Sequence, residues 1–187
     1  MTENSYQLSD SFGYLTHNEI NGIKQLVNMV SESNPQVINI GAGAGTSGIS
    51  ILEAREDSHL ITLDMRIDSP LGSLQSEINA LEKSGLGDIS DRHSQVLGNS
   101  SELADMFDNE TIHMVFIDGD HERNGVRADI SAFLPKITRG GIIAFHDYGI
   151  RADGIEPWPE VKIAVDELIR PQYEWLVHMD TVIGFRV

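Results

Sequence analysis

The sequence contains no cysteine, and this absence excludes disulfide bonds, thiolate metal ligands and a cysteine nucleophile. It permits a reducing compartment such as the cytosol. Basic residues are also scarce, because 13 lysines and arginines stand against 29 acidic residues and give a formal net charge of −16. A surface of this charge repels the phosphates of nucleic acids and of anionic membranes, so we expect neither as a partner.

Long hydrophobic runs are missing as well. No apolar stretch approaches the roughly 18 residues that a membrane helix needs, and residues 1–7 lack the basic and apolar regions of a signal peptide. The 187 residues can bury one sizeable core but are too few for a nucleotide-binding domain plus a separate substrate domain. We therefore expect a cytoplasmic protein with a single domain over residues 1–187, in which the polar residues 1–12 are flexible.

A glycine-rich turn follows the first predicted strand. The largely apolar residues 37–40 are typical of a buried parallel strand, and glycine at every second position of 41–45 lets the backbone approach a ligand closely. Thr46 and Ser47 open a helix whose free N–H groups favour a nucleotide-like ligand. Residues 43–48 also fit the G-x-G-x-x-G dinucleotide pattern, which alone is a weak signal. The alternative is a turn that serves only the strand-to-helix geometry.

Asp64 ends the second predicted strand, which covers residues 59–64. It lies 19 residues after Gly45 (64 − 45 = 19). A carboxylate at a strand tip about 20 residues after the glycines can accept both hydroxyls of an adenosine ribose. The alternative is that Asp64 caps the turn that follows it.

The rest of the chain alternates between helical and extended patterns. Helices are expected to start at Thr16, with a capping box, at Ser69–Pro70 and at Asn99. Another ends at Gly140–Gly141, and the last follows the loop at 149–159. The expected strands are residues 37–40, 59–64, 94–98, 111–118, 142–145, 175–178 and 181–187. This order predicts an α/β fold with a doubly wound, mostly parallel sheet, an antiparallel pair at its edge, and ligands beyond the carboxyl ends of its strands.

The residues at these strand ends resemble those of the class I S-adenosylmethionine (SAM) dependent methyltransferases, over Gly13 to Val187. The turn at 41–45 resembles the first motif of that family, Asp64 its ribose-binding acid, and the last two strands its reversed seventh strand. Further motifs are similar to the small-molecule O-methyltransferases that include macrolide and aminocoumarin sugar methyltransferases, and more distantly to catechol O-methyltransferase. These motifs are Ile117–His121, Val126, Asp129–Ile130, Leu134–Pro135, Gly140–Ile143 and His146–Tyr148.

This resemblance implies a Rossmann-like fold of seven strands with helices on both faces, and methyl transfer from SAM to a small-molecule acceptor, at a hydroxyl oxygen. A homo-oligomer is compatible with the sequence. The implied cofactor-binding residues are Asn39, Gly41, Gly43, Gly45, Thr46, Ser47, Asp64, Met65, Asn99, Ser100, Asp118, Gly119 and Asp120. Asn39 departs from the family, which often has an acid at that position. An acid there would hold the cationic part of SAM more firmly than Asn39.

Asp118 and Asp147 follow adjacent strands and are expected to face each other. Two carboxylates suit Mg²⁺, with His146 as a further ligand. The family has either two adjacent acids or Asp-Asn after this strand, whereas Tyr148 follows Asp147 here, so one expected metal ligand is missing. His121 and His146 are the candidate bases, because imidazole titrates near neutral pH. The predicted catalytic residues are therefore Asp118, His121, His146 and Asp147.

Several polar and aromatic residues have a second interpretation. Asp120 and Asp129 can cap the helix after the fourth strand, and we prefer that role for Asp129. Tyr14, Tyr148 and Trp158 are placed to line a substrate entrance, although aromatic residues in such positions often serve packing.

Two other functions also fit the glycine turn. One is an NAD(P)-dependent oxidoreductase, which the chain length and the Asp-Gly-Asp-His motif disfavour. The other is a non-catalytic SAM-binding protein that keeps the turn without a complete metal site.

Overall fold

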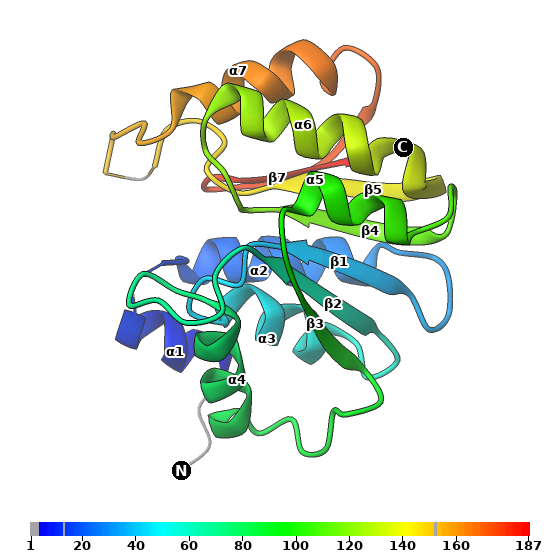
Figure 1. Cartoon of the computed structure of the whole chain (residues 1–187). Coiled ribbons are helices and arrows are strands. Elements are labelled where there is room, and N and C mark those ends of the chain that lie inside the picture. The colour runs from blue at the N-terminus through cyan, green and yellow to red at the C-terminus, as the bar shows by residue number, and fades with distance from the viewer. Residues whose placement is uncertain (1–3, 13, 152) are drawn as a thin grey trace.

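The protein forms one seven-stranded sheet with helices on both faces, as the computed structural model shows (Figure 1). The structure describes residues 4–12, 14–151 and 153–187. The strands are β1 (Gln36–Ile40), β2 (His59–Asp64), β3 (His93–Leu97), β4 (Ile112–Ile117), β5 (Ile137–Phe145), β6 (Glu174–Met179) and β7 (Val182–Arg186). Their order in the sheet is β3-β2-β1-β4-β5-β7-β6, and β7 runs antiparallel to both of its neighbours. The predicted doubly wound, mostly parallel sheet with a reversed last strand is confirmed.

The helices form two layers, one on each face of the sheet (Figure 1). Helices α1 (Ser5–Phe12), α2 (His17–Asn28), α3 (Thr46–Ala54) and α4 (Leu74–Lys83) lie on one face. Helices α5 (Ser100–Leu103), α6 (Arg123–Phe133) and α7 (Pro159–Leu168) lie on the other, with short 3₁₀ turns at Ala104–Met106 and Leu134–Lys136. Among the described residues, no helix is long and apolar enough to cross a membrane.

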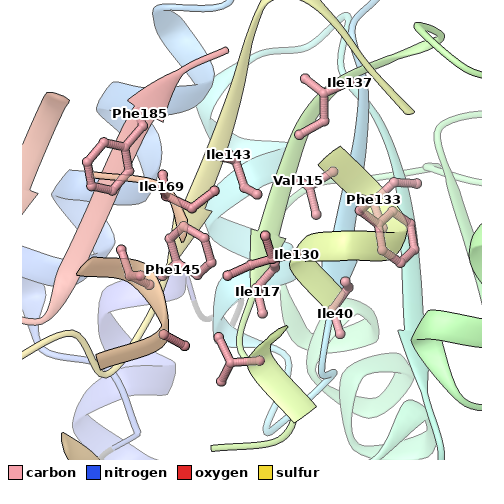
Figure 2. Packing of buried hydrophobic residues seen from close by; sticks show 14 of the residues in the cluster. Ile40, Val115, Ile117, Ile130, Phe133, Ile137, Ile143, Phe145, Ile169 and Phe185 are labelled. Atoms are coloured by element: carbon pink, nitrogen blue, oxygen red, sulfur yellow. The ribbon is translucent and has the colours of Figure 1, made fainter. Parts of the chain in front are cut away.

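The central strand β4 shows why the sheet is covered on both faces. Its side chains alternate, so that Met114 and Phe116 pack in the cluster with α2 and α3. Val115 and Ile117 pack in the opposite cluster, where Figure 2 shows Ile130 of α6 beside them. All four strand residues are at most 3% exposed. A continuous apolar run is what a parallel strand buried on two faces requires.

Two predictions near the amino-terminal half were wrong. Residues 5–12, expected to be flexible, form helix α1, whose Leu8 is fully buried against α3 and α4; residues 1–3 lie outside the described part of the chain. The helix predicted at Ser69–Pro70 starts at Leu74, with Ser73 as its N-cap. Ser73 N donates a hydrogen bond to Gly43 O, so a contact with the distant glycine turn sets the start of the helix.

The boundary between α6 and β5 also differs from the prediction. The helix expected to reach Gly140–Gly141 ends at Phe133, and β5 already begins at Ile137. Pro135 lies in the short 3₁₀ turn between them, where its missing N–H cannot extend the α-helix. The longer β5 carries His146 and Asp147 at its carboxyl end.

Candidate active site

A cavity of about 430 Å³ opens at the carboxyl ends of β1 to β4. This volume lies within the range of small-molecule and cofactor sites, about 300–1,000 Å³. The residues that line the cavity are Ile40, Gly41, Leu63, Asp64, Met65, Arg66, Gly98, Asn99, Ser100, Ser101, Gly119, Asp120, His121, Gly125, Ala128 and Asp129. Seven of the predicted cofactor-binding residues are among them: Gly41, Asp64, Met65, Asn99, Ser100, Gly119 and Asp120.

The glycine turn contributes less of the cavity wall than the sequence predicted. Within the described part of the chain, the lining includes Gly41 but none of the predicted residues Gly43, Gly45, Thr46 and Ser47. Gly41 has a φ of +95°, and a Cβ atom there would lie 2.1 Å from the carbonyl oxygen of Asp118. A Cβ on Gly45 would lie 2.9 Å from Cβ of Ala80 in α4. These two glycines are therefore required by close packing of the chain on itself.

Asn39 also lies behind the turn and outside the cavity lining. It is fully buried, and its Nδ2 donates hydrogen bonds to Gly41 O at 3.1 Å and to Ser47 Oγ at 3.2 Å. Its Oδ1 has no hydrogen-bond partner among the described residues. Asn39 thus fixes the conformation of the turn that precedes α3.

Asp64 stabilises the turn that follows it, which was the alternative interpretation of the sequence, and it also lies in the cavity wall. Its Oδ2 accepts a hydrogen bond from Ala42 N at 2.9 Å, and its Oδ1 accepts one from Arg66 N at 2.7 Å. The carboxylate therefore stabilises the turn after β2, yet it also lines the cavity. Arg66 Nε also donates to Oδ1 at 3.3 Å, so Oδ2, which accepts one hydrogen bond and has two lone pairs, is the oxygen that can accept a ligand hydroxyl.

Asp129 is a cavity residue that sequence reasoning assigned wrongly. It was expected to cap α6, but it lies within that helix, is 3% exposed and accepts a hydrogen bond from Ser100 Oγ at 2.5 Å. Burial raises the pKa of Asp129 to about 6. Asp120 does not cap α6 either: its Oδ1 accepts a hydrogen bond from Glu122 N at 2.9 Å in the turn before the helix, and the N-cap residue is Glu122, without a side-chain cap. The sequence did contain a signal that Asp129 is buried, because it lies between Val126 and Ile130, which are both buried. Burying an acid there costs free energy unless the acid has a partner.

The four predicted catalytic residues meet in a polar cluster beside the cavity. His121 Nε2 lies 2.9 Å from Asp147 Oδ2 and 3.7 Å from Asp118 Oδ1. His146 Nδ1 lies 3.1 Å from the same Asp118 oxygen and 3.2 Å from the same Asp147 oxygen. Each imidazole therefore touches both carboxylates. The compact set of potential metal ligands is Asp118, His121 and Asp147, with donor atoms within 4.8 Å of one another.

The cluster holds its histidines in the charged form. Burial opposes protonation, but the hydrogen bonds and charges of Asp118 and Asp147 raise the pKa of His121 to about 9. The pKa of His146 is likewise raised well above its ordinary value, against its burial, by these carboxylates and by Glu19. Burial would raise the pKa of Asp147, yet hydrogen bonds from both imidazoles lower it. His121 must therefore lose its own proton before it can act as the predicted base, and the shift in the pKa of His146 has the same direction.

Glu19 is a second residue whose role the sequence did not reveal. It completes the predicted capping box with Thr16, but its Oε1 also accepts a hydrogen bond from Thr181 Oγ1 at 2.5 Å and lies 3.5 Å from His146 Nε2. Burial opposes ionisation, but the contact with His146 lowers the pKa of Glu19 to about 2. The capping pattern explained Glu19 locally and so hid its long-range contact.

The aromatic residues predicted at the entrance have three different positions. Trp158 stacks on His121, with ring centroids 4.6 Å apart and an interplanar angle of 22°, and remains 42% exposed. Tyr14 is exposed and lines a separate cavity with residues of α4. Tyr148 is buried, and its hydroxyl donates a hydrogen bond to Asp166 Oδ1 of α7 at 2.7 Å. Tyr148 therefore points away from the polar cluster and offers it no ligand.

The comparisons with known proteins agree with this architecture. The family model described as a methyltransferase domain matches residues 38–148, which is more than half of the chain. The chain belongs to this methyltransferase family. Membership confirms the resemblance drawn from the motifs and contradicts the alternative of an NAD(P)-dependent oxidoreductase. None of the curated proteins searched matches the sequence significantly.

Solved structures share the fold at low sequence identity. The O-methyltransferase NovP is 16% identical with a TM-score of 0.70, over 91% of this chain and 80% of that chain. The O-methyltransferase TomG from Streptomyces achromogenes, solved in complex with SAM, is 13% identical with a TM-score of 0.66, over 98% and 86%. A protein from Corynebacterium glutamicum is 18% identical with a TM-score of 0.70, over 98% and 87%.

Proposed function

We propose that the protein transfers a methyl group from SAM to a hydroxyl oxygen of a small molecule. The observation that carries this proposal is the position of His121, which lines the cavity and lies 2.9 Å from Asp147 in the polar cluster. A methyl donor in the cavity and an acceptor at the polar cluster would then lie next to each other, on either side of His121. The O-methyltransferases NovP and TomG, which have the same fold, support the assignment to oxygen.

The residues present fit SAM as the cofactor. The cavity offers Asp64 at one side for hydroxyl groups, and the buried carboxyl of Asp129 at another for a hydrogen-bond donor. Met65 and Gly119, which follow β2 and β4, and the apolar side chains of Ile40 and Leu63 also line the cavity. SAM, when bound, supplies a methyl group on a positively charged sulfur. The protein's part is to orient donor and acceptor, which can provide much of the rate enhancement.

A divalent metal also fits the polar cluster. Asp118, His121 and Asp147 would hold it, and His146, whose Nδ1 contacts both carboxylates, would support them. The metal, when bound, supplies positive charge that lowers the pKa of a coordinated hydroxyl. The expected set was Asp118, Asp147 and His146 with Mg²⁺; the geometry adds His121, and an imidazole ligand also suits ions such as Mn²⁺ or Zn²⁺. Since the Tyr148 hydroxyl points to α7, His121 would take the place of the missing ligand.

Binding and turnover measurements test this function together. Calorimetry should show binding of SAM and of its demethylated product, S-adenosylhomocysteine, and weak or no binding of NADH. Incubation of SAM with a panel of phenols and sugars should yield S-adenosylhomocysteine and an O-methylated product by mass spectrometry. Titration of metal-free Trp175→Phe protein with Mn²⁺ and Mg²⁺, followed by the fluorescence of the remaining Trp158, which stacks on His121, reports metal binding independently of activity. Binding of SAM without turnover on any hydroxyl acceptor would favour the non-catalytic alternative.

A further inference from the structure

Glu19 is a buried carboxylate whose neighbours fix its position. It is 4% exposed. Its Oε2 accepts a hydrogen bond from Thr16 N at 2.7 Å, within the capping box that starts α2. Its Oε1 accepts hydrogen bonds from Thr181 Oγ1 at 2.5 Å and from Thr181 N at 3.3 Å, in the turn between β6 and β7. Thr181 O in turn accepts from Tyr148 N at 2.9 Å, so the same turn also holds the chain directly after Asp147.

Glu19 meets the polar cluster at the imidazole of His146. Glu19 Oε1 lies 3.5 Å from His146 Nε2. The other ring nitrogen, Nδ1, lies 3.1 Å from Asp118 Oδ1 and 3.2 Å from Asp147 Oδ2. His146 is 8% exposed, and its Nε2 has no closer hydrogen-bond partner among the described residues. The imidazole thus has carboxylates at both nitrogens, and Glu19 is the acceptor available to Nε2.

A carboxylate beside Nε2 determines which form of neutral His146 is favoured. The two neutral forms differ in which ring nitrogen carries the proton, and an ionised carboxylate can only accept a hydrogen bond. Glu19 therefore favours the form with the proton on Nε2. The lone pair of Nδ1 then faces the oxygens of Asp118 and Asp147, which is repulsive unless a cation lies beside them. Both aspartates belong to the compact set of potential metal ligands.

We propose that Glu19 is a positioning residue for this metal site: it keeps the proton of His146 on Nε2 and so presents Nδ1 as a ligand beside Asp118 and Asp147. The inference rests on the proposed binding of a divalent metal at the polar cluster. A histidine that binds a metal is neutral, and a carboxylate that accepts its remaining N–H fixes both the protonated nitrogen and the orientation of the ring. Glu19 acts through His146 alone.

The first test replaces Glu19 by glutamine, which keeps the size of the side chain. Thr16 N is a donor and should hold the amide oxygen at the Oε2 position, so the NH₂ group takes the place of Oε1 and faces His146. This favours the proton on Nδ1, which leaves no lone pair for a metal. Calorimetric titration of the metal-free variant with Mn²⁺ should show about 10–100-fold weaker binding than the parent, with unchanged affinity for S-adenosylhomocysteine.

Thr16→Ala is the matched control for the structural role of Glu19. It removes the hydroxyl that caps α2 and that donates to Asp180, but it keeps the backbone N–H that binds Glu19. Thermal unfolding should show a lower melting temperature for this variant. Its affinity for Mn²⁺ should equal that of the parent, because the contact between Glu19 and His146 is kept.

The second test leaves Glu19 in place. In parent protein labelled with ¹⁵N-histidine and saturated with Zn²⁺, the nitrogen chemical shifts of His146 should show a protonated Nε2 and a metal-bound Nδ1. The same spectrum of Glu19→Gln should show a protonated Nδ1. Because the first of these spectra needs no change at Glu19, it tests the proposal even if the glutamine variant does not fold.

The outcomes separate this inference from the proposed function. If the parent binds neither Mn²⁺ nor Zn²⁺, the metal site and the role of Glu19 are both overturned, whereas the use of SAM is judged by the binding of S-adenosylhomocysteine. If the parent binds metal but Glu19→Gln binds it equally well, or His146 carries its proton on Nδ1 in the parent, only the role of Glu19 is overturned. Equal weakening in Glu19→Gln and Thr16→Ala would also overturn it and make Glu19 a structural link between α2 and the β6–β7 turn.

Discussion

Asp147 and Asp129 are buried to a similar degree, at 8% and 3% exposed, but their surroundings give them opposite properties. Two imidazoles contact Asp147 and lower its pKa. Asp129 has one hydroxyl as its partner, and burial raises its pKa. In the polar cluster the acids face imidazoles, whereas Asp129 in the cavity wall has the neutral Ser100 hydroxyl beside it. Burial alone therefore does not predict the charge state of an acid in this protein.

The largest effect is expected from removing the charge of Asp147. Asp147→Asn keeps the shape and tolerates the left-handed backbone, φ +57°, but no longer balances the two imidazolium groups. With an accepted substrate, we expect kcat/KM to fall on the order of 10²–10⁴-fold, the usual contribution of a group that assists proton transfer. Activity that is unchanged would remove Asp147 from the chemistry and leave positioning alone as the source of catalysis.

A second prediction uses the pH dependence of stability in metal-free protein. The folded-state pKa of His121, about 9, exceeds its ordinary value of 6.5. The stabilisation is therefore complete below about pH 6.5 and is lost as the pH rises through 9, by up to about 3 kcal/mol. Urea unfolding with a chelator between pH 6 and 10 measures it. His121→Gln should reduce the slope to the part that His146 contributes, whereas His59→Gln, at an exposed histidine of β2, should leave it unchanged. A flat profile in the parent would contradict the ionic interpretation of the cluster.

Asp64 provides a third measurement, on the cavity side of the comparison. Asp64→Ala removes the proposed acceptor for ribose hydroxyls, and we expect SAM binding to weaken by about 1.5–3 kcal/mol, the scale of a hydrogen bond to a charged group. The variant also loses the bonds to Ala42 N and Arg66 N, so the turn itself is weakened. Asp64→Asn separates the two effects, because its Oδ1 can still accept from one of these N–H groups. Calorimetric affinities equal to that of the parent would exclude the ribose role.

The smallest expected effect is a gain in the free energy of unfolding, in contrast to the losses predicted for the other variants. The pKa of Asp129 is raised to about 6, so its folded-state penalty is absent below about pH 3.8 and grows as the pH rises through 6. We expect Asp129→Asn to be more stable than the parent by roughly 1–2 kcal/mol at pH 7.5, after allowance for cavity water. The gain should vanish near pH 4. A loss of stability at pH 7.5 would show that the Ser100 hydrogen bond to the carboxylate outweighs burial.

The sequence predicted the scaffold well where the pattern is local. Strand β2 and the start of α2 coincide with their predictions, because a short apolar run that ends in an acid and a capping box are each recognised within a few residues. The start of α4 was missed because Ser69 and Ser73 are equally good caps, and the choice depends on the contact with Gly43. A single sequence does not contain that distance information.

For the candidate site, too, the sequence predicted some features and missed others. The convergence of Asp118, His121, His146 and Asp147 followed from their places at strand ends. Their charge states did not follow, since the pKa of each histidine depends on which carboxylates lie beside it and on its burial. Asp129 was missed for a related reason, because its helical position suggested a cap when its side chain faces the cavity.

Gly41 connects the cavity with the polar cluster. Its N–H donates a hydrogen bond to Leu63 O of β2, and the carbonyl oxygen of Asp118 occupies the space where a side chain would be. Asp118 N in turn donates to Ile40 O, so backbone alone connects the two strand ends. Backbone in direct contact has no rotatable group that could absorb a displacement. A cofactor that moves the turn at Gly41 would therefore also move Asp118, and we expect the acceptor to bind productively only after the cofactor, in an ordered sequence.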